Sequence, residues 1–329
     1  MRVRRLPTMS ASVEAATPER NLSVVQRVGT EIAANVRRAL EVRDEVVELM
    51  LITLIARGHV LIEDRPGVGK TALARALARS IRAEFSRIQC TADLLPADVV
   101  GSMVFNQRET RFEFHSGPVF ANVVLVDEIN RASPKTQSGL LEAMQERGVT
   151  VEGETHELAR PFLIVATQNP VEFAGTYPLP EAQLDRFMAR VALGYPDAAA
   201  EAEMLAAHAA GDLVVDLEPV VGLEEVLAAQ DAAAAVHGSA ALRRYVVALV
   251  AATRSDSRVE LGASPRAALM LFQAGMARAA LRGRDHVLPD DIQALADPVL
   301  SHRLLLAPGS GDGQRSTVVA DALASVPAL

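Results

Sequence analysis

The sequence predicts an α/β protein: a three-layer αβα core with a parallel five-stranded sheet, followed by a small all-helical domain. Up to residue 193, short apolar runs of strand length alternate with segments of helical periodicity. This pattern is typical of a parallel sheet covered by helices on both faces. Beyond residue 196 the chain is rich in alanine and helical spacings, without a good strand. We therefore predict a tail at 1–22, an α/β core at 23–196 and an all-helical domain at 197–329.

The first predicted elements after the tail are two helices. Residues 1–22 mix proline, serine, threonine and charged residues without periodicity, which is typical of a poorly ordered tail. Apolar residues then recur at helical spacing over 24–39, and Asp44 is the expected N-cap of an apolar helix that ends near residue 56. Because this second helix is apolar on every side, we expect it to be buried between other elements.

Five apolar runs supply the predicted sheet, and helices and two hairpins separate them. The strands are expected at 59–63, 86–90, 121–126, 161–167 and 187–193. Helices are expected at 72–81, 134–147 and 180–186, and β-hairpins at 101–115 and 148–158. In the second domain, helical spacings recur around 242–249 and 269–280, and Ser239 and Ser264 are the expected N-caps of these helices.

Composition narrows the function classes. The 329 residues carry a net charge of −8, which gives no overall electrostatic footprint for nucleic acid. The single cysteine, Cys90, excludes an internal disulfide or a cysteine-cluster metal site, and we expect it to be a buried strand residue. The longest apolar runs are too short to span a bilayer, and no apolar signal core follows the basic first residues. We expect a cytoplasmic protein without a membrane span.

The stretch at 64–71, which reads DRPGVGKT, lies between the first predicted strand and a helix-forming segment. This is the arrangement of a phosphate-binding loop, whose backbone N–H groups meet an anion at the start of a helix. Lys70 would reach the outer phosphates of ATP, and the Thr71 hydroxyl would ligate Mg²⁺. The usual pattern has glycine where this chain has Asp64. The predicted nucleotide-binding residues are Asp64, Pro66, Gly67, Val68, Gly69, Lys70, Thr71 and Ala72.

Polar residues follow two further predicted strands. Asp127 and Glu128 end the run at 121–126, where Asp127 can hold the Mg²⁺ opposite Thr71 and Glu128 can polarise the attacking water. Asn169 follows the next strand and either completes the hydrogen bonds of that water or is a turn residue before Pro170. An acidic pair at the end of a buried strand, downstream of a Gly-Lys-Thr loop, favours an ATPase.

Two arginines are further candidates for the catalytic site. Arg186 is either an arginine finger supplied to a neighbouring subunit or the partner in a salt bridge at a helix C-terminus. Arg266 begins a helix, where the helix dipole disfavours a cation, so it either contacts the γ-phosphate or is an ordinary surface arginine. None of the seven histidines has metal-ligand spacing.

Taken together, these stretches resemble the AAA+ ATPases, and more narrowly the MoxR family, over roughly residues 24–305. The most specific stretches are GPVFAN at 117–122, DEINRASPKTQ at 127–137, ATQNP at 166–170 and GTYPLPEAQLDRF at 175–187. The resemblance implies roles for matching residues: Asn169 as the first sensor, Arg186 as the trans-acting finger and Arg266 as the second sensor. Asp64 is also familiar in this family.

The resemblance further implies a hexameric ring with a helical lid, which uses Mg-ATP for chaperone-like remodelling of partner proteins. Its usual partners carry von Willebrand factor A or similar domains. The hairpin at 105–114 resembles the helix-2 insert shared with magnesium-chelatase ATPase subunits. One departure affects the base-binding region: the family commonly has Val-Gly-Gln where this chain has Val42, Arg43 and Asp44. That segment lies near the adenine in relatives.

Three other function classes compete with this interpretation. A nucleic-acid motor on the same fold would need basic, aromatic pore hairpins, whereas the hairpin tips at 107–110 and 151–154 are mixed and acidic. A nucleotide-gated scaffold would hydrolyse little ATP, and intact Lys70, Glu128 and Arg186 argue against it. A small-molecule kinase would need neither a trans arginine nor a sensor asparagine. We therefore predict a homo-oligomeric ATPase that does not act on nucleic acid.

Overall fold

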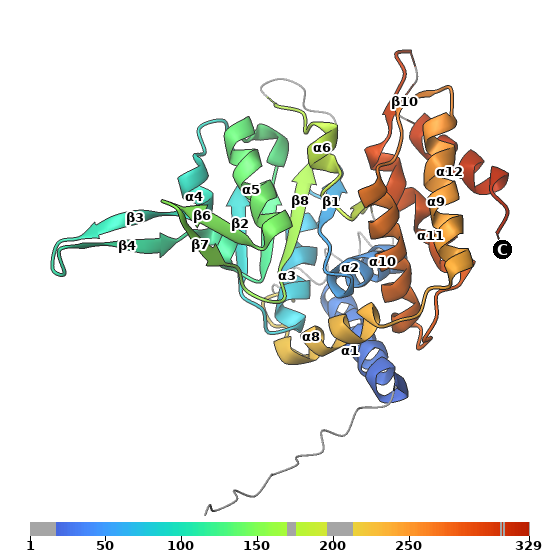
Figure 1. Ribbon diagram of the computed structural model, residues 1–329. Helices are drawn as coiled ribbons and strands as arrows, with labels where there is room; N and C mark the ends of the chain where they lie inside the picture. The colour runs from blue at the N-terminus through green and yellow to red at the C-terminus, as the bar shows by residue number, and fades with distance from the viewer. Residues whose placement is uncertain (1–17, 170–175, 196–212, 310, 312, 329) are drawn as a thin grey trace, which may run out of the picture.

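A parallel five-stranded sheet forms the centre of the α/β part of the protein (Figure 1). The computed structural model describes residues 18–169, 176–195, 213–309, 311 and 313–328. The strand order is β2-β5-β8-β1-β9, and all neighbours are parallel, which confirms the predicted sheet. The strands are β1 (Val60–Glu63), β2 (Phe85–Gln89), β5 (Val123–Asp127), β8 (Leu163–Gln168) and β9 (Ala189–Val191).

Helices cover both faces of this sheet. Alternate strand residues face opposite layers, so Leu61 and Ile164 belong to one buried cluster and Ile62 and Val165 to the other. The helices and 3₁₀ turns of the α/β part are α1 (Pro18–Ala39), α2 (Asp44–Ile55), α3 (Lys70–Ser80), α4 (Pro96–Val100), η1 (Pro118–Phe120), η2 (Ile129–Arg131), α5 (Pro134–Glu146) and α6 (Glu181–Leu184).

Two details at the N-terminal end differ from the predictions. Helix α1 begins at Pro18, so residues 18–22 of the expected tail are helical; residues 1–17 lie outside the described part. Asp44 is not the N-cap of α2, because that position is Arg43 and no side chain caps the helix. The Asp44 carboxylate instead forms an ion pair with Arg37 at 2.7 Å. It lies in the first turn of α2, where the helix dipole favours an acid.

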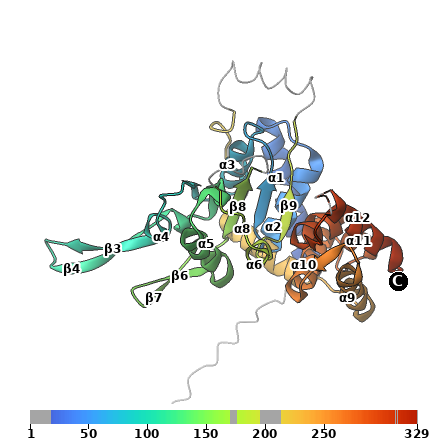
Figure 2. The ribbon, with the colours of Figure 1, turned by 90° about the horizontal axis from the view of Figure 1, so that it is seen from above.

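Two antiparallel hairpins extend from the α/β part, as predicted (Figures 1 and 2). The Phe114 ring of the first stacks on the His156 ring of the second, with centroids 3.9 Å apart, so the hairpins support each other. Their strands are β3 (Gly101–Asn106), β4 (Arg111–Ser116), β6 (Gly148–Val151) and β7 (Glu154–Glu157).

The C-terminal part is mainly helical. As predicted, the Ser239 and Ser264 hydroxyls cap their helices by accepting hydrogen bonds from backbone N–H groups. The prediction that this part lacks strands is wrong, because two short strands pair as an antiparallel ribbon. Strands this short carry no readable periodicity. The elements are α8 (Leu223–Ala234), α9 (Ala240–Ser255), β10 (Val259–Leu261), α10 (Pro265–Leu281), α11 (Pro289–Leu300), η3 (Ser301–Arg303), β11 (Leu305–Leu306) and α12 (Gln314–Ser325).

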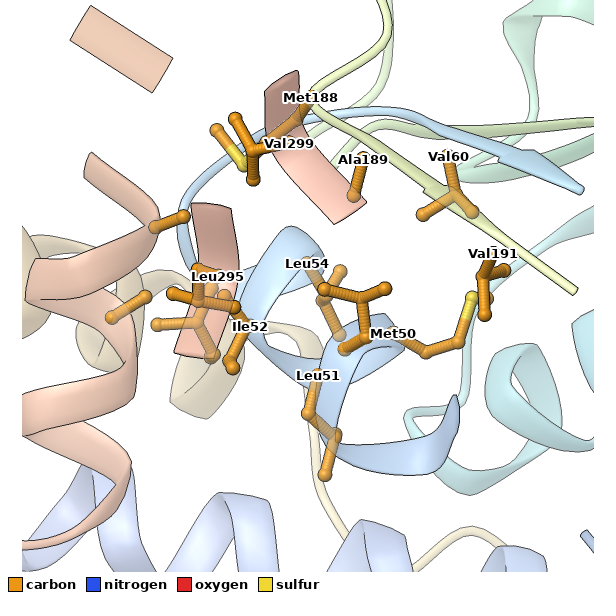
Figure 3. Packing of buried hydrophobic residues seen from close by; sticks show 14 of the residues in the cluster. Met50, Leu51, Ile52, Leu54, Val60, Met188, Ala189, Val191, Leu295 and Val299 are labelled. Carbon is orange, nitrogen blue, oxygen red and sulfur yellow. The ribbon is translucent and has the colours of Figure 1, made fainter. Parts of the chain in front are cut away.

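Helix α2 lies between the sheet and the C-terminal helices, as its apolar composition predicts (Figure 3). Met50 and Leu54 point toward β1 and β9, whereas Ile52 lies beside Leu295 of α11. All belong to one buried cluster, so the α/β part and the helical part share a core. In the described ranges, no helix combines the length and apolar character needed to cross a membrane.

Candidate active site

The phosphate-binding loop connects the carboxyl end of β1 to the start of α3. Gly67 and Gly69 have φ angles of 85° and 89°, a conformation that side chains rarely adopt. A Cβ atom built on either glycine would meet no heavy atom within 4 Å, so open space faces the loop. Gly69 is the N-cap of α3 and Lys70 its first residue, and the free N–H groups of this helix start therefore suit an anion.

Asp64 closes this loop onto the segment that follows β9. One carboxylate oxygen accepts from the Arg65 N–H at 2.8 Å, and the other accepts from the Gly194 N–H at 2.7 Å. The Lys70 ammonium donates to the Asp64 carbonyl at 2.7 Å. The aspartate at the usual glycine position therefore fastens the loop to the end of β9. Pro66, Val68, Thr71 and Ala72 lie in the same loop and helix start.

The acidic pair lies at the carboxyl end of β5, near Lys70. Burial lowers the pKa of Lys70, and the charges of Asp127, Asp64 and Glu128 oppose that shift. The Thr167 hydroxyl on the neighbouring strand β8 donates to Asp127 Oδ1 at 2.6 Å and accepts from the Glu128 N–H at 2.9 Å. One hydroxyl therefore fixes both acidic residues.

Glu128 has an unusual backbone conformation. Its φ angle is 56°, in the left-handed region that costs a non-glycine residue about 1–2 kcal/mol. Strain of this kind is typical of functional sites when the surroundings hold it, and here Thr167 binds the Glu128 N–H. The conformation places the Glu128 side chain beyond the strand end, where Arg131 donates to Glu128 Oε2 at 2.9 Å and Gln89 at 3.2 Å.

Four residues around the acidic pair were not predicted as site residues: Arg87, Gln89, Arg131 and Thr167. Arg87 on β2 donates to Asp127 Oδ2 at 2.6 Å. The pairing of β2 with β5 brings these side chains together, because Gln89 lies opposite Asp127 in that strand pair. Thr167 and Arg131 fall within stretches that carry the family resemblance, which is the signal that could have found them.

The predicted arginines lie at a separate junction between the α/β part and the helical part. Arg186 is half-buried after α6; among the described residues it forms no ion pair, so the predicted helix-end salt bridge is not found there. Its neighbour Asp185 accepts from Arg303 at 2.6 Å and from the Ser264 hydroxyl at 2.9 Å. Arg266 lies in the first turn of α10, after Ser264. Within the described ranges, neither Arg186 nor Arg266 has a hydrogen bond or ion pair to Lys70, whose ammonium group donates to the Asp64 carbonyl.

Arg303 is the buried centre of this junction, with 4% of its surface exposed. Burial lowers its pKa to about 10; Asp185 opposes this shift, and Arg266 adds to it. Arg303 also donates to the Phe187 carbonyl at 2.6 Å, beside the start of β9. Asp185 and Arg303 therefore tie the segment that carries Arg186 to the helix that carries Arg266.

A cleft of about 760 Å³ lies between α2, the ends of β1 and β9, and helices α10 and α11. Arg43 lines it and donates to the Ala192 and Leu193 carbonyls. An ion pair on its wall joins Arg190 to Glu63 at 2.6 Å. The segment where the chain departs from the family pattern therefore forms one side of this cleft.

Asn169 is 8% exposed at the end of β8, the strand that also carries Thr167. Cys90 is buried, as predicted, but it lies one residue beyond β2, which ends at Gln89, so it is not a strand residue. Burial and the nearby Asp127 and Glu128 raise its pKa to about 12. Within the described ranges, no cluster of three His, Cys, Asp or Glu side chains could hold a metal ion. A divalent ion would therefore rely on Asp127, Thr71 and the substrate phosphates, as Mg²⁺ commonly does.

Comparisons with known proteins agree with this architecture. The profile of the "ATPase family associated with various cellular activities (AAA)" matches residues 59–189, and that of the "AAA lid domain" matches 251–322. Chaperone MoxR1 of Mycobacterium tuberculosis is 43% identical over 280 residues, which cover 82% of this chain and 74% of the relative. The chain belongs to the MoxR family of AAA+ ATPases. The predicted family, fold and ATPase activity are thereby confirmed.

Other members and neighbours extend this assignment. The uncharacterized protein YeaC of Bacillus subtilis is 48% identical over 274 residues, which cover 83% of this MoxR-family chain and 86% of that protein. A crystal structure from Cytophaga hutchinsonii superposes with a TM-score of 0.86 at 37% identity, over 94% of this chain and 98% of its own. The α/β part and the helical lid therefore have the same arrangement in a solved relative.

Proposed function

We propose that this MoxR-family ATPase hydrolyses Mg-ATP at the interfaces of a homo-oligomeric ring and uses the energy to remodel partner proteins. The observation that carries the proposal is the Thr167 hydroxyl, which joins Asp127 Oδ1 and the Glu128 N–H beside Lys70. The acids, the ammonium group and the glycine loop then face one space. That arrangement suits the binding of phosphate and the activation of water.

The roles follow from what each group can reach. The loop N–H groups and Lys70 would bind the β- and γ-phosphates in the open space beside Gly67 and Gly69. Mg²⁺, held by Thr71 and Asp127, would neutralise charge on the phosphates. Arg87 donates to Asp127 Oδ2 in the structure, so Mg²⁺ would take the place of this guanidinium on the carboxylate.

Glu128 would take the proton from the attacking water. Gln89 and Arg131 hold one of its carboxylate oxygens, which keeps the other available for that water. Asn169 would complete the hydrogen bonds of the same water from the neighbouring strand end. We place the nucleoside in the cleft that Arg43 lines, because the cleft adjoins the strand that leads into the loop.

Arg186 and Arg266 would act on the γ-phosphate of a nucleotide. The half-buried Arg186 guanidinium has no ion-pair partner within the described ranges, and its Nε atom has no hydrogen-bond acceptor. An arginine in this state suits an anionic partner supplied by another subunit. We therefore propose that Arg186 completes a neighbour's site and that Arg266 acts from the lid, with a hexameric ring as the assembly. The core would comprise residues 23–196 and the lid 197–329.

The hairpin surface favours a protein partner over nucleic acid. Phe105 and Phe112 are 46% and 64% exposed and lie with ring centroids 5.2 Å apart on the β3-β4 hairpin. The nearby Arg111 is neutralised by Glu109 and Glu113, so the aromatic pair lacks the basic setting of a nucleic-acid groove. We propose a partner with a von Willebrand factor A or similar domain, together with its client, in the cytoplasm.

Mixed rings test the trans role of Arg186. Arg186→Ala retains its own loop, and Lys70→Ala retains its own finger, so each variant alone should be inactive. A mixture should regain part of the ATPase activity at interfaces that combine an intact loop with an intact finger. Assembled mixed rings without any regained activity would contradict the proposal, and a mixture of Lys70→Ala with Glu128→Gln is the matched control that should stay inactive.

A further inference from the structure

A second pocket lies at the opposite end of the sheet from the phosphate-binding loop. It has a volume of about 250 Å³, and three arginines line it: Arg57, Arg147 and Arg160. Arg57 precedes β1 and Arg160 precedes β8, so the pocket adjoins the amino ends of strands whose carboxyl ends form the ATPase site. Helix α8 of the lid closes it with Gln230 and Asp231.

The backbone at two of these arginines directs them to the pocket from helix ends. Arg57 follows α2 with a φ angle of 58°, and Arg147 is the C-cap of α5 with a φ angle of 52°. Glycine is the usual residue in this conformation at a helix end. A cation there gains from the helix dipole, which offsets part of the repulsion between the two arginines. Arg160 lies on no helix, so that explanation does not cover it.

Negative charge in the pocket is insufficient for three guanidinium groups. Among the described residues that line the pocket, Asp231 is the one carboxylate; it pairs with Arg57, and 75% of its side chain is exposed. Arg147 donates to the Arg57 carbonyl at 3.4 Å, and neither it nor Arg160 has a carboxylate partner in the described ranges. Burial lowers the pKa of Arg147, and so do the charges of Arg57 and Arg160. The wall therefore carries two positive charges in excess.

We propose that this pocket binds a small oxyanion of the phosphate class that carries two negative charges. Such an ion would balance the excess charge, and guanidinium groups bind phosphate oxygens through paired N–H donors. The volume corresponds to roughly eight water molecules at about 30 Å³ each, which admits phosphate or diphosphate. The site is independent of the ATPase roles proposed above, because it lies at the other end of the strands.

Calorimetric titration of the full chain with inorganic phosphate, and separately with diphosphate, tests this site. The Lys70→Ala background weakens phosphate binding at the ATPase loop, and constant ionic strength in chloride removes general salt effects. Arg147→Asn keeps a residue that tolerates the left-handed conformation, and Arg160→Gln changes an exposed side chain. We expect each substitution to weaken binding by about tenfold.

Arg82→Asn is the matched control. Arg82 also follows a helix in the left-handed conformation, with a φ angle of 53°, but does not line the pocket. It should leave the affinity unchanged. Thermal unfolding gives a second measurement: phosphate should raise the melting temperature of the Lys70→Ala parent, and less so that of the Arg147→Asn/Arg160→Gln variant. Absence of binding to the parent, or equal affinity in parent and double variant, would overturn the proposal. Tighter binding of phosphate than of diphosphate would assign the site to the free ion, and the reverse to a phosphoryl group on a larger molecule.

Discussion

The junction between the α/β part and the lid depends on Asp185. Its carboxylate accepts from Arg303 at 2.6 Å and from the Ser264 hydroxyl at 2.9 Å. We expect Asp185→Ala to reduce the free energy of unfolding, because the substitution leaves the Arg303 charge buried without its anion. An unpaired charge would cost more on Arg303 than on Asp185, since 1% of the Arg303 side chain is exposed against 18% for Asp185.

The magnitude follows from that burial. Removal of one partner from a buried ion pair costs about 3–5 kcal/mol. Arg303 keeps its hydrogen bonds to the Phe187 carbonyl and to the Asp185 carbonyl, and Asp185 is partly solvated. We therefore expect a loss of about 3 kcal/mol, at the lower end of that range. Chemical denaturation measures it directly.

A matched surface pair serves as the control. Asp321 lies 2.6 Å from Arg258, the same distance as in the buried pair, but 57% of its side chain is exposed. Asp321→Ala should cost less than about 1 kcal/mol. A cost of Asp185→Ala no larger than that of Asp321→Ala would contradict the role of Asp185 as the counter-ion of the buried Arg303. If Asp185→Ala also loses ATPase activity at temperatures where it remains folded, the junction is needed for activity as well as for stability. That result would support a role of the junction in positioning the neighbouring Arg186.

Two further changes have distinct expected outcomes. Thr167→Val removes the hydroxyl that binds Asp127 and the Glu128 N–H, and we expect the turnover rate to fall by about 10–100-fold while circular dichroism stays unchanged. The pKa of His59 falls to about 4, mainly through burial, so the folded protein binds fewer protons than the unfolded chain between the usual value near 6.5 and 4. Stability should therefore decrease as pH falls through this range, by roughly 3 kcal/mol in total from this residue. His59→Gln should make the free energy of unfolding depend less steeply on pH between 6.5 and 4, whereas substitution of the exposed His115 by Gln should leave that slope unchanged. Equal slopes in the two variants would contradict the contribution of His59.

Local sequence patterns were sufficient for most of the sheet and for the phosphate-binding loop. Each central strand is a continuous apolar run, because helices cover both of its faces. Such a run can be recognised in the sequence without knowing which strands lie beside it. Gly67 and Gly69 could also be recognised from local sequence, because the positive φ angle that glycine permits is a property of the residue itself. Asp127 could be read from its place at the end of such a run.

Residues whose partners are distant in sequence could not be found in this way. Thr167 lies inside an apolar strand and meets Asp127 through sheet register, 40 positions away. The contact between Arg303 and Asp185 spans 118 positions. Asp44 illustrates a different limit, since its type suits an N-cap, but the helix begins one residue earlier than that role requires.

The most direct test of the central claim is the activity of Glu128→Gln, because Glu128 is proposed to take the proton from the attacking water. Glutamine keeps the size and hydrogen-bond capacity of the side chain but cannot accept that proton at neutral pH. Binding is measured with a fluorescent ATP analogue, and hydrolysis by phosphate release in a single turnover. We expect ATP affinity close to that of the unsubstituted protein, with hydrolysis reduced by about 10²–10⁴-fold. Hydrolysis at the unsubstituted rate would contradict the proposed role of Glu128.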